Sequence, residues 1–213
     1  MVMEVNGYRI EPGADLTGAD LTGANLLGAD LSGAKLWRAI LAGANLAYAK
    51  LLKTDLVKAD MSGADLHNAN LTGADMRSTN LSNANLQSAK FVRSRLVDAN
   101  LADTNLAGAN LERANLSNAD LTGADLTLAN LAGANLADAE LTRARLGDAR
   151  LTGANLHCAN LKDANLCGAN FFDAVMSNTN LTRANLRGAN LHHADLEGAI
   201  LTGAIMPDGS IHD

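Results

Sequence analysis

Several residue types on which small folds and active sites depend are scarce in this sequence. The 213 residues include two cysteines and two prolines, and aromatic residues make up 3% of the chain. No apolar run is long enough to cross a membrane, and the opening MVMEVNGYRI lacks the apolar segment of a signal peptide. We therefore expect a cytoplasmic protein with a core of aliphatic side chains.

Positive charge is also in deficit. Seventeen lysines and arginines stand against twenty-three aspartates and glutamates, which gives a formal net charge of −6 at pH 7. A surface with excess negative charge repels phosphate groups, so general binding to nucleic acid is disfavoured. The length is that of a single domain.

The dominant feature of the sequence is a pattern with a period of five. From Leu16 to Met206 every fifth residue is large and apolar, at thirty-nine positions of which thirty-three are leucine. Helices repeat every 3.6 residues and strands every two, so neither element buries this pattern. A chain that turns a corner every five residues does bury it, and four corners close a square coil of twenty residues.

The residues around each large apolar position fit this geometry. Two residues before it lies a small residue, always alanine, serine or threonine, which we expect to face inward. The two residues after it are predicted to form the turn. The second of these needs a positive φ, which favours glycine, and fifteen of the nineteen glycines fall there.

The run GADLTGADLTGANLLGADLSGA and its continuation resemble the pentapeptide-repeat family, written A(D/N)LXX, over about nine-tenths of the chain. The resemblance implies an all-β fold, a right-handed quadrilateral β-helix. Thirty-nine repeats at four per coil predict about ten coils. The ending MPDGSIHD is similar to the C-terminal tails of cyanobacterial members of the family.

We predict three segments along the chain. Residues 1–13 form an N-terminal cap, residues 14–206 form the β-helix, and residues 207–213 form a C-terminal tail. Asn6 and Gly7 lie between alternating apolar residues, a pattern that is typical of a β-hairpin. Its apolar residues are expected to cover the open first coil, because an uncovered solenoid end exposes both core and sheet edge.

The surface departs most from the repeat on two adjacent sides of the square. We name the sides that contain Leu16, Leu21, Leu26 and Leu31 sides one, two, three and four. Between residues 33 and 113, sides one and four carry ten basic and four acidic residues, with outward-facing apolar residues among them. We define the basic–apolar strip by thirteen of these residues: Lys35, Trp37, Arg38, Lys50, Leu52, Lys53, Val57, Lys58, Lys90, Val92, Arg93, Arg95 and Val97.

Two interpretations of the strip are open at this stage. Exposed apolar residues combined with arginine and tryptophan have the composition of a protein–protein contact. The alternative is neutral variation on a tolerant surface. In the last coil, outward-facing Ile200 and Ile205 are interpreted either as part of an end cap or as a small end-to-end contact.

Sides two and three are more acidic. An acidic rod is able to imitate a DNA duplex, and members of the resembled family that protect DNA gyrase give this alternative a precedent. The competing interpretation is that aspartate and asparagine suit the position before the buried leucine for structural reasons.

No catalytic or metal-binding constellation emerges from the sequence. Of the five histidines, only His192 and His212 are twenty residues apart, and His212 lies in the predicted tail beyond the repeats. The adjacent pair His192 and His193 is expected to splay apart at its corner, so neither arrangement predicts a metal site. Cys158 and Cys167 fall on opposite sides of one coil, which argues against a disulfide between them. A filled solenoid also offers no pocket for a substrate.

We therefore predict a non-enzymatic scaffold for protein interaction or regulation, without a cofactor or a metal. It is expected to be a monomer or weak dimer whose partner is an unidentified protein. A DNA mimic that binds DNA gyrase is the alternative, and a structural or stress-related role without a specific partner is the third interpretation.

Overall fold

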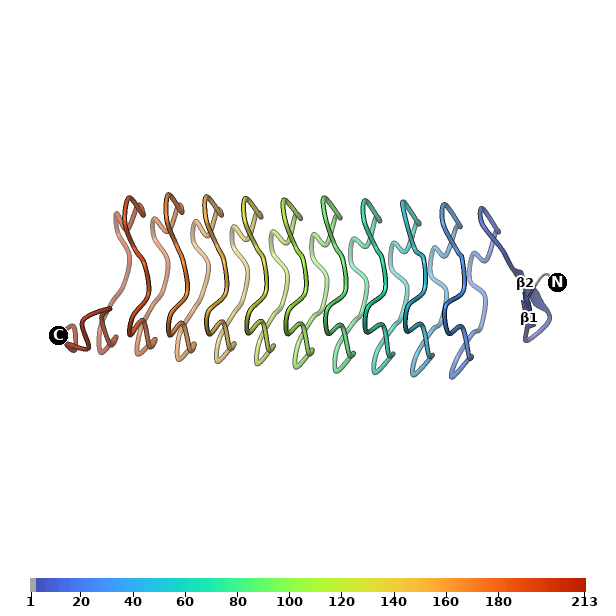
Figure 1. Ribbon diagram of the computed structural model, residues 1–213, viewed down its shortest axis with the longest axis horizontal. Helices are drawn as coiled ribbons and strands as arrows, with labels where there is room; N and C mark the ends of the chain where they lie inside the picture. Colours follow the sequence, from blue (N-terminus) through green and yellow to red (C-terminus); the bar gives the residue numbers. More distant parts are fainter. Residues whose placement is uncertain (1–2) are drawn as a thin grey trace.

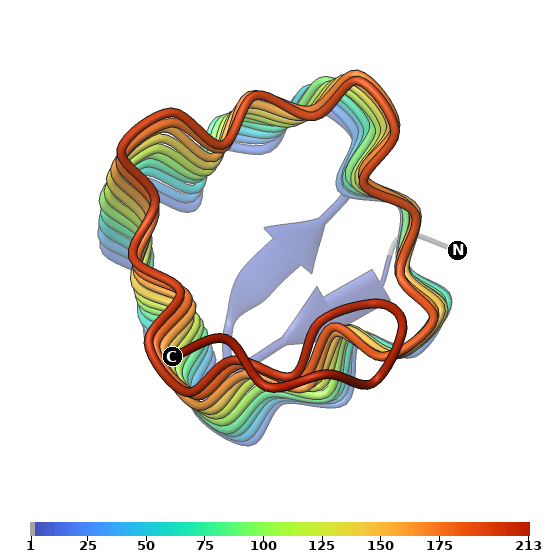
Figure 2. The same ribbon diagram turned by 90° about the vertical axis from the view of Figure 1, so that its left-hand side faces the viewer.

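The computed structural model describes residues 3–213; the first two residues of the predicted cap lie outside the described residues. The chain winds into a straight shaft of stacked coils, with the two termini at opposite ends (Figure 1). Seen along its axis, each coil has a square outline, and successive coils superpose side on side (Figure 2). None of the described residues belongs to a helix that could span a membrane.

A β-hairpin closes the N-terminal end of the shaft. Strand β1 (Met3–Val5) pairs antiparallel with β2 (Tyr8–Ile10), and the connecting Asn6 and Gly7 both have a positive φ. The hairpin lies across the open square of the first coil (Figure 2). Ile10 is buried in the core cluster, and the half-buried Tyr8 contacts the same cluster. The first coil is thereby shielded from water, and Leu16 is buried.

Hydrogen bonds between residues about twenty apart hold the coils in register. Parallel bridges run from Asp15 and Lys35 at one end to Asn185 and Ile205 at the other. In the first repeat, the N–H of Leu16 donates to the Lys35 carbonyl at 2.7 Å, and the N–H of Lys35 donates to the Ala14 carbonyl at 2.9 Å. Because the same bonds recur on all four sides, the ladder groups along the shaft are bonded to neighbouring coils.

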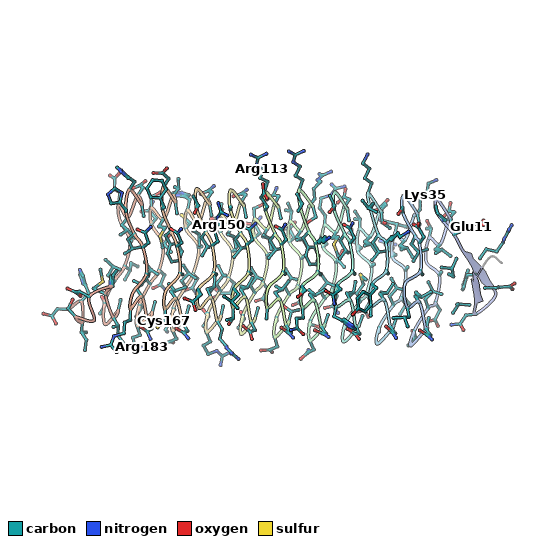
Figure 3. The ribbon with its side chains drawn as sticks, viewed as in Figure 1. Glu11, Lys35, Arg113, Arg150, Cys167 and Arg183 are labelled. Atoms are coloured by element: carbon teal, nitrogen blue, oxygen red, sulfur yellow. The ribbon has the colours of Figure 1, made fainter. Side chains whose placement is uncertain are left out.

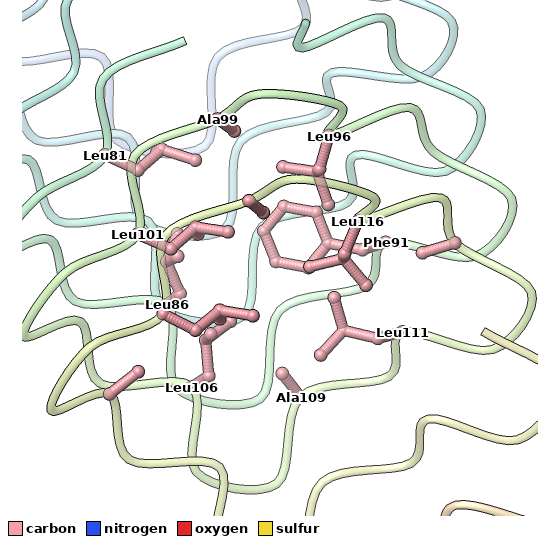
Figure 4. Packing of buried hydrophobic residues seen from close by; sticks show 14 of the residues in the cluster. Leu81, Leu86, Phe91, Leu96, Ala99, Leu101, Leu106, Ala109, Leu111 and Leu116 are labelled. Atoms are coloured by element: carbon pink, nitrogen blue, oxygen red, sulfur yellow. The ribbon is translucent and has the colours of Figure 1, made fainter. Parts of the chain in front are cut away.

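The core is a stack of leucine and alanine layers. The large apolar residues from Leu16 to Leu186 and the small residues from Ala19 to Ala184 are buried, and they meet in the centre of the square (Figure 4). Where threonine replaces alanine, its hydroxyl finds a main-chain acceptor; Thr79 Oγ1, for example, donates to the Leu56 carbonyl at 2.8 Å. Among the described residues, no buried side-chain nitrogen or oxygen lacks a hydrogen-bond partner.

Every repeat turns its corner in the same way. From Gly18 to Gly203, the second residue after each buried apolar residue has a φ between 53° and 71°. This left-handed region is easy for glycine and costs other residues about 1 kcal/mol or more. Long side chains such as those of Lys53 and Leu128 nevertheless occupy it.

The C-terminal end is covered less completely than the N-terminal end. The large apolar residues of the last coil, such as Leu196 and Leu201, are half-buried. The tail folds back so that Ile211 pairs antiparallel with Ile205, and it lies over one side of the square (Figure 2). Ile200 is exposed, whereas Ile205 is half-buried beside the tail.

We expect Leu116→Lys to unfold the middle coils. Leu116 is fully buried, and an unpaired ammonium group there would cost several kcal/mol in addition to about 3 kcal/mol of lost packing. Thermal unfolding followed by circular dichroism should show a large loss of stability. Ser117→Lys, one residue further on at an outward position, is the control and should unfold like the wild type. A wild-type melting temperature for Leu116→Lys would contradict the inward assignment.

Candidate partner-binding surface

The thirteen strip residues occupy three outward positions of the repeat. Lysine or arginine lies directly before the buried apolar residue, an apolar side chain takes the first turn position, and another cation takes the second. All thirteen lie at the surface, with the cations and Trp37 exposed and the other apolar residues half-buried. Trp37 has 39% of its surface exposed.

Ion pairs neutralise part of the positive charge of the strip. Lys35 lies 3.9 Å from Asp15, and Lys50 lies 3.4 Å from Asp30, in both cases one coil away along the same column. Arg95 is 3.2 Å from Asp75. The other strip cations form no ion pair with a described residue: Arg38, Lys53, Lys58, Lys90 and Arg93.

Asp75 is the main anion inside the strip, and it is already engaged. Its carboxylate accepts hydrogen bonds from Arg77 at 2.8 Å and from Arg95 at 3.2 Å. Burial tends to raise the pKa of Asp75, but the bonds from Arg77 and the charge of Arg95 outweigh it and hold the pKa below its ordinary value. Asp75 therefore offsets two arginines on side one, whereas on side four Lys50 is the one strip cation with an ion pair to a described residue.

The uncompensated cations on side four line one corner of the shaft. Lys53 and Arg93 share the second turn position with Arg113, one coil further on. Figure 3 shows Arg113 projecting from the upper edge of the shaft, whereas Cys167 and Arg183 lie along the opposite edge. At the N-terminal end of the strip, the Arg38 guanidinium lies 4.3 Å from the centre of the Trp37 ring, a cation–π contact.

Four repeats of the strip lack a turn hydrogen bond that regular repeats have, and they share this lack with the repeats of Ile40, Arg145, Arg150, Val175 and Ile200. In a regular repeat, the aspartate or asparagine before the buried leucine accepts a hydrogen bond from the N–H of the first turn residue. Asn70 and Asn110 on side four accept such bonds at 3.2 and 3.1 Å. Lysine and arginine have no acceptor, and four turn N–H groups of the strip have no partner among the described residues: those of Trp37, Leu52, Val92 and Val97.

Three segments of the strip combine three departures from the optimal repeat. In KLWR (35–38), KLLK (50–53) and KFVR (90–93), a cation replaces the turn acceptor, an apolar residue faces outward, and a long cation adopts a positive φ. The lost hydrogen bond and the strained φ each cost about 1 kcal/mol. The three departures together are therefore unfavourable for the stability of the fold.

The N–H groups without partners were not among the features we predicted from the sequence. A signal for them is present, because lysine or arginine stands where the A(D/N)LXX motif has its acceptor. Large exposed apolar residues outside the strip were also missed; they are Leu27, Ile40, Tyr48, Leu128, Val175 and Ile211. Tyr48 contacts His67 edge to face at 5.0 Å, and His67 Nδ1 lies 2.8 Å from Asp65 Oδ1.

The prediction that His192 and His193 splay apart is wrong. Their ring centres are 4.0 Å apart, because Phe172 on the previous coil gives both rings a shared surface at 5.9 and 5.6 Å.

Within residues 3–213 there is no cavity and no group of three or more histidine, cysteine or acidic residues arranged to hold a metal ion. Cys158 and Cys167 are free thiols.

The carboxylates on sides two and three serve the turns. Asp20, Asp60 and Asp120 accept the N–H of the first turn residue at 3.0, 3.1 and 2.9 Å. Hydrogen bonds from Thr22 hold the pKa of Asp20 below its ordinary value. These contacts favour the structural interpretation of the acidic sides.

We expect Lys90→Asn to stabilise the protein. The new amide would accept the free N–H of Val92, as Asn110 does for Glu112 in the same column, and one hydrogen bond adds about 1 kcal/mol. Lys90→Ala removes the same charge without providing an acceptor and is the matched control. Chemical denaturation should rank Lys90→Asn above both wild type and control. Equal stability of the two variants would show that the turn N–H is satisfied without a side-chain acceptor.

Comparison with known proteins agrees with this architecture. A family model described as pentapeptide repeats matches the chain in eight copies spread over residues 12–203. Among solved structures, the chain is similar to HetL, a pentapeptide repeat protein involved in heterocyst differentiation regulation from the cyanobacterium Nostoc sp. strain PCC 7120. The identity is 41%, covering 97% of this chain and 94% of HetL, with a TM-score of 0.52.

Two further structures are more distant. QnrB1, a plasmid-mediated fluoroquinolone resistance protein, is 19% identical over 88% of this chain and 86% of its own, with a TM-score of 0.52, and this likeness shows the fold alone. A pentapeptide repeat protein from the Arabidopsis thaliana thylakoid lumen is 34% identical over 46% of this chain and 69% of its own, with a TM-score of 0.43. No curated protein matches the sequence. The chain belongs to the pentapeptide-repeat family, whose members are right-handed quadrilateral β-helices.

Proposed function

We propose that this protein is a non-enzymatic scaffold that presents the basic–apolar strip to a protein partner in a regulatory role. Proteins of the family are generally structural or protein-binding scaffolds, and HetL takes part in the regulation of differentiation. The proposal rests on KLWR, KLLK and KFVR, each of which departs from the regular repeat at all three outward positions. These departures lower the stability of the fold, and they lie on two adjacent sides of the shaft.

The anatomy of the strip supports a protein partner. Residues 35–97 span three coil spacings, which at about 4.8 Å each correspond to about 14 Å along the shaft. Apolar side chains such as Trp37, Leu52 and Val92 lie among uncompensated cations, the usual arrangement of an apolar centre with a polar rim.

Free thiols at Cys158 and Cys167 fit a reducing compartment, and we propose the cytoplasm as the place of action.

Affinity capture from a cytoplasmic extract of the source cells tests the proposal. Wild type is compared with a triple variant, Trp37→Glu, Lys53→Glu and Arg93→Glu, which reverses charge and removes the aromatic anchor. We expect the wild type to retain a partner that the variant loses by about tenfold or more, because buried anchors and charges dominate binding energy.

A matched control separates the strip from net charge. Thr127→Glu, Arg143→Glu and Lys162→Glu change the net charge by the same amount on sides two and three and should leave capture intact. If both variants lose the partner equally, the effect is due to overall charge. If both retain the partner equally, the partner binds a surface other than the strip.

The DNA-mimic alternative depends on the acidic sides, and its support is weaker. Carboxylates such as Asp60 and Asp120 are engaged in turn hydrogen bonds. We expect micromolar protein to leave supercoiling by DNA gyrase unchanged, because this surface carries carboxylates that serve the fold. Potent inhibition in a supercoiling assay, retained by the strip variant, would reverse the ranking of the two functions. A structural role without a partner is what remains if both assays are negative.

A further inference from the structure

We propose that the partner binds the strip through an acidic amphipathic α-helix that lies along the corner of side four, parallel to the shaft. Its carboxylates would take the free turn N–H groups of Leu52 and Val92, and its apolar side chains would cover the strip's apolar residues. This inference rests on the proposed function and names the class of partner. Three features support this mode of binding: the closed hydrogen-bond ladder, the spacing of the free N–H groups and the cations beside them.

The closed ladder excludes one common mode of peptide binding on the sides of the shaft. An extended peptide binds by adding a strand to a free sheet edge. Here the ladder groups on side four are already bonded to adjacent coils; the N–H of Leu51, for example, donates to the Asn70 carbonyl at 2.8 Å. Partner segments that bind this side must therefore satisfy their own main chain, as a helix does.

The free turn N–H groups are chemically suited to carboxylates. On the same column, Ser32 N–H donates to the carboxylate of Asp30 at 3.1 Å within the chain. At Leu52 and Val92 that carboxylate is missing, and cations lie on both sides: Lys50 and Lys53, Lys90 and Arg93. A partner's carboxylate would supply from outside the acceptor that Asp30 supplies from within, through hydrogen bonds strengthened by charge.

The spacing of these two sites matches a helix. Leu52 and Val92 are two coils apart, which is about 9.6 Å at about 4.8 Å per coil. Residues i and i+7 of an α-helix lie on one face about 10.5 Å apart. Side chains on one face of a strand repeat at about 6.6 Å or 13 Å, and neither value fits.

The repeat between the two sites leaves room for an apolar contact. It carries Thr72 and Gly73 at its turn, and an added methyl group at Gly73 would meet only the Lys53 side chain, at 3.5 Å. An apolar residue at i+3 or i+4 of the helix would be seated there, between Leu52 and Val92. Duplex DNA offers one phosphate per about 1.7 Å but nothing to cover these apolar residues.

Fluorescence anisotropy with the full chain tests the inference. The probe is a labelled, alanine-rich helical peptide of about 20 residues, with glutamates seven apart and leucine at i+3 and i+4 between them. A peptide of the same composition with the glutamates moved to the opposite face is the first control, and a duplex DNA of similar length is the second. We expect the designed peptide to bind about tenfold more tightly than either control.

Protein variants locate the binding site. Lys53→Glu with Arg93→Glu should weaken peptide binding by about tenfold or more, whereas the matched pair Arg143→Glu and Lys162→Glu should change it less than about twofold. Lys90→Asn should bind about threefold more weakly than Lys90→Ala, because only the asparagine occupies the Val92 N–H. Equal affinity of the two Lys90 variants would rule out docking on that N–H.

Each contrary result has a distinct meaning. Tighter binding of duplex DNA would make the strip a nucleic-acid surface and overturn the inference, as would equal binding of the two peptides. If affinity capture recovers a partner that depends on the strip but the designed peptide does not bind, the proposed function stands and the helical partner is refuted. If neither assay shows dependence on the strip, both are refuted.

Discussion

The hydrogen bonds between residues about twenty apart are the constraint on which the rest of this structure depends. They fix each repeat against its counterpart on the neighbouring coils, so a slip by one residue would turn a whole column of leucines out to solvent. With register fixed, two of every five residues belong to the core and three to the surface. The surface becomes a regular array in which each position has its own structural requirement. A residue that does not meet the requirement of its position can therefore be identified.

The three outward positions differ in what they demand. The position before the buried residue prefers a side-chain acceptor, the second turn position prefers a residue that tolerates a positive φ, and the first turn position is nearly free. Leu128 departs at one position only, because Asp125 still accepts the N–H of Thr127 at 3.0 Å. In KFVR (90–93) all three positions depart together. Coincident departures are harder to attribute to neutral variation than single ones.

Sequence reasoning reached the fold because the period of five leaves no alternative packing, and it placed the strip on the outer surface because register follows from counting. It did not identify which cations are neutralised, although Asp15 and Asp30 lie one coil from Lys35 and Lys50. Such pairing depends on side-chain conformation. The contact between His192 and His193 depends on Phe172 in the coil before, which a view of neighbouring residues alone misses.

A solenoid tolerates a locally destabilising repeat better than a globular core does. Each repeat contacts only its neighbours, so the cost of a strained turn or a missing acceptor stays within one or two coils. The repeats before and after KLLK (50–53) keep regular acceptors at Asn45 and Asp55, with turn hydrogen bonds of 3.1 Å each. Regular repeats can therefore hold a suboptimal one in place, and recognition can evolve at the corners of the square without disturbing the leucine stack that stabilises it.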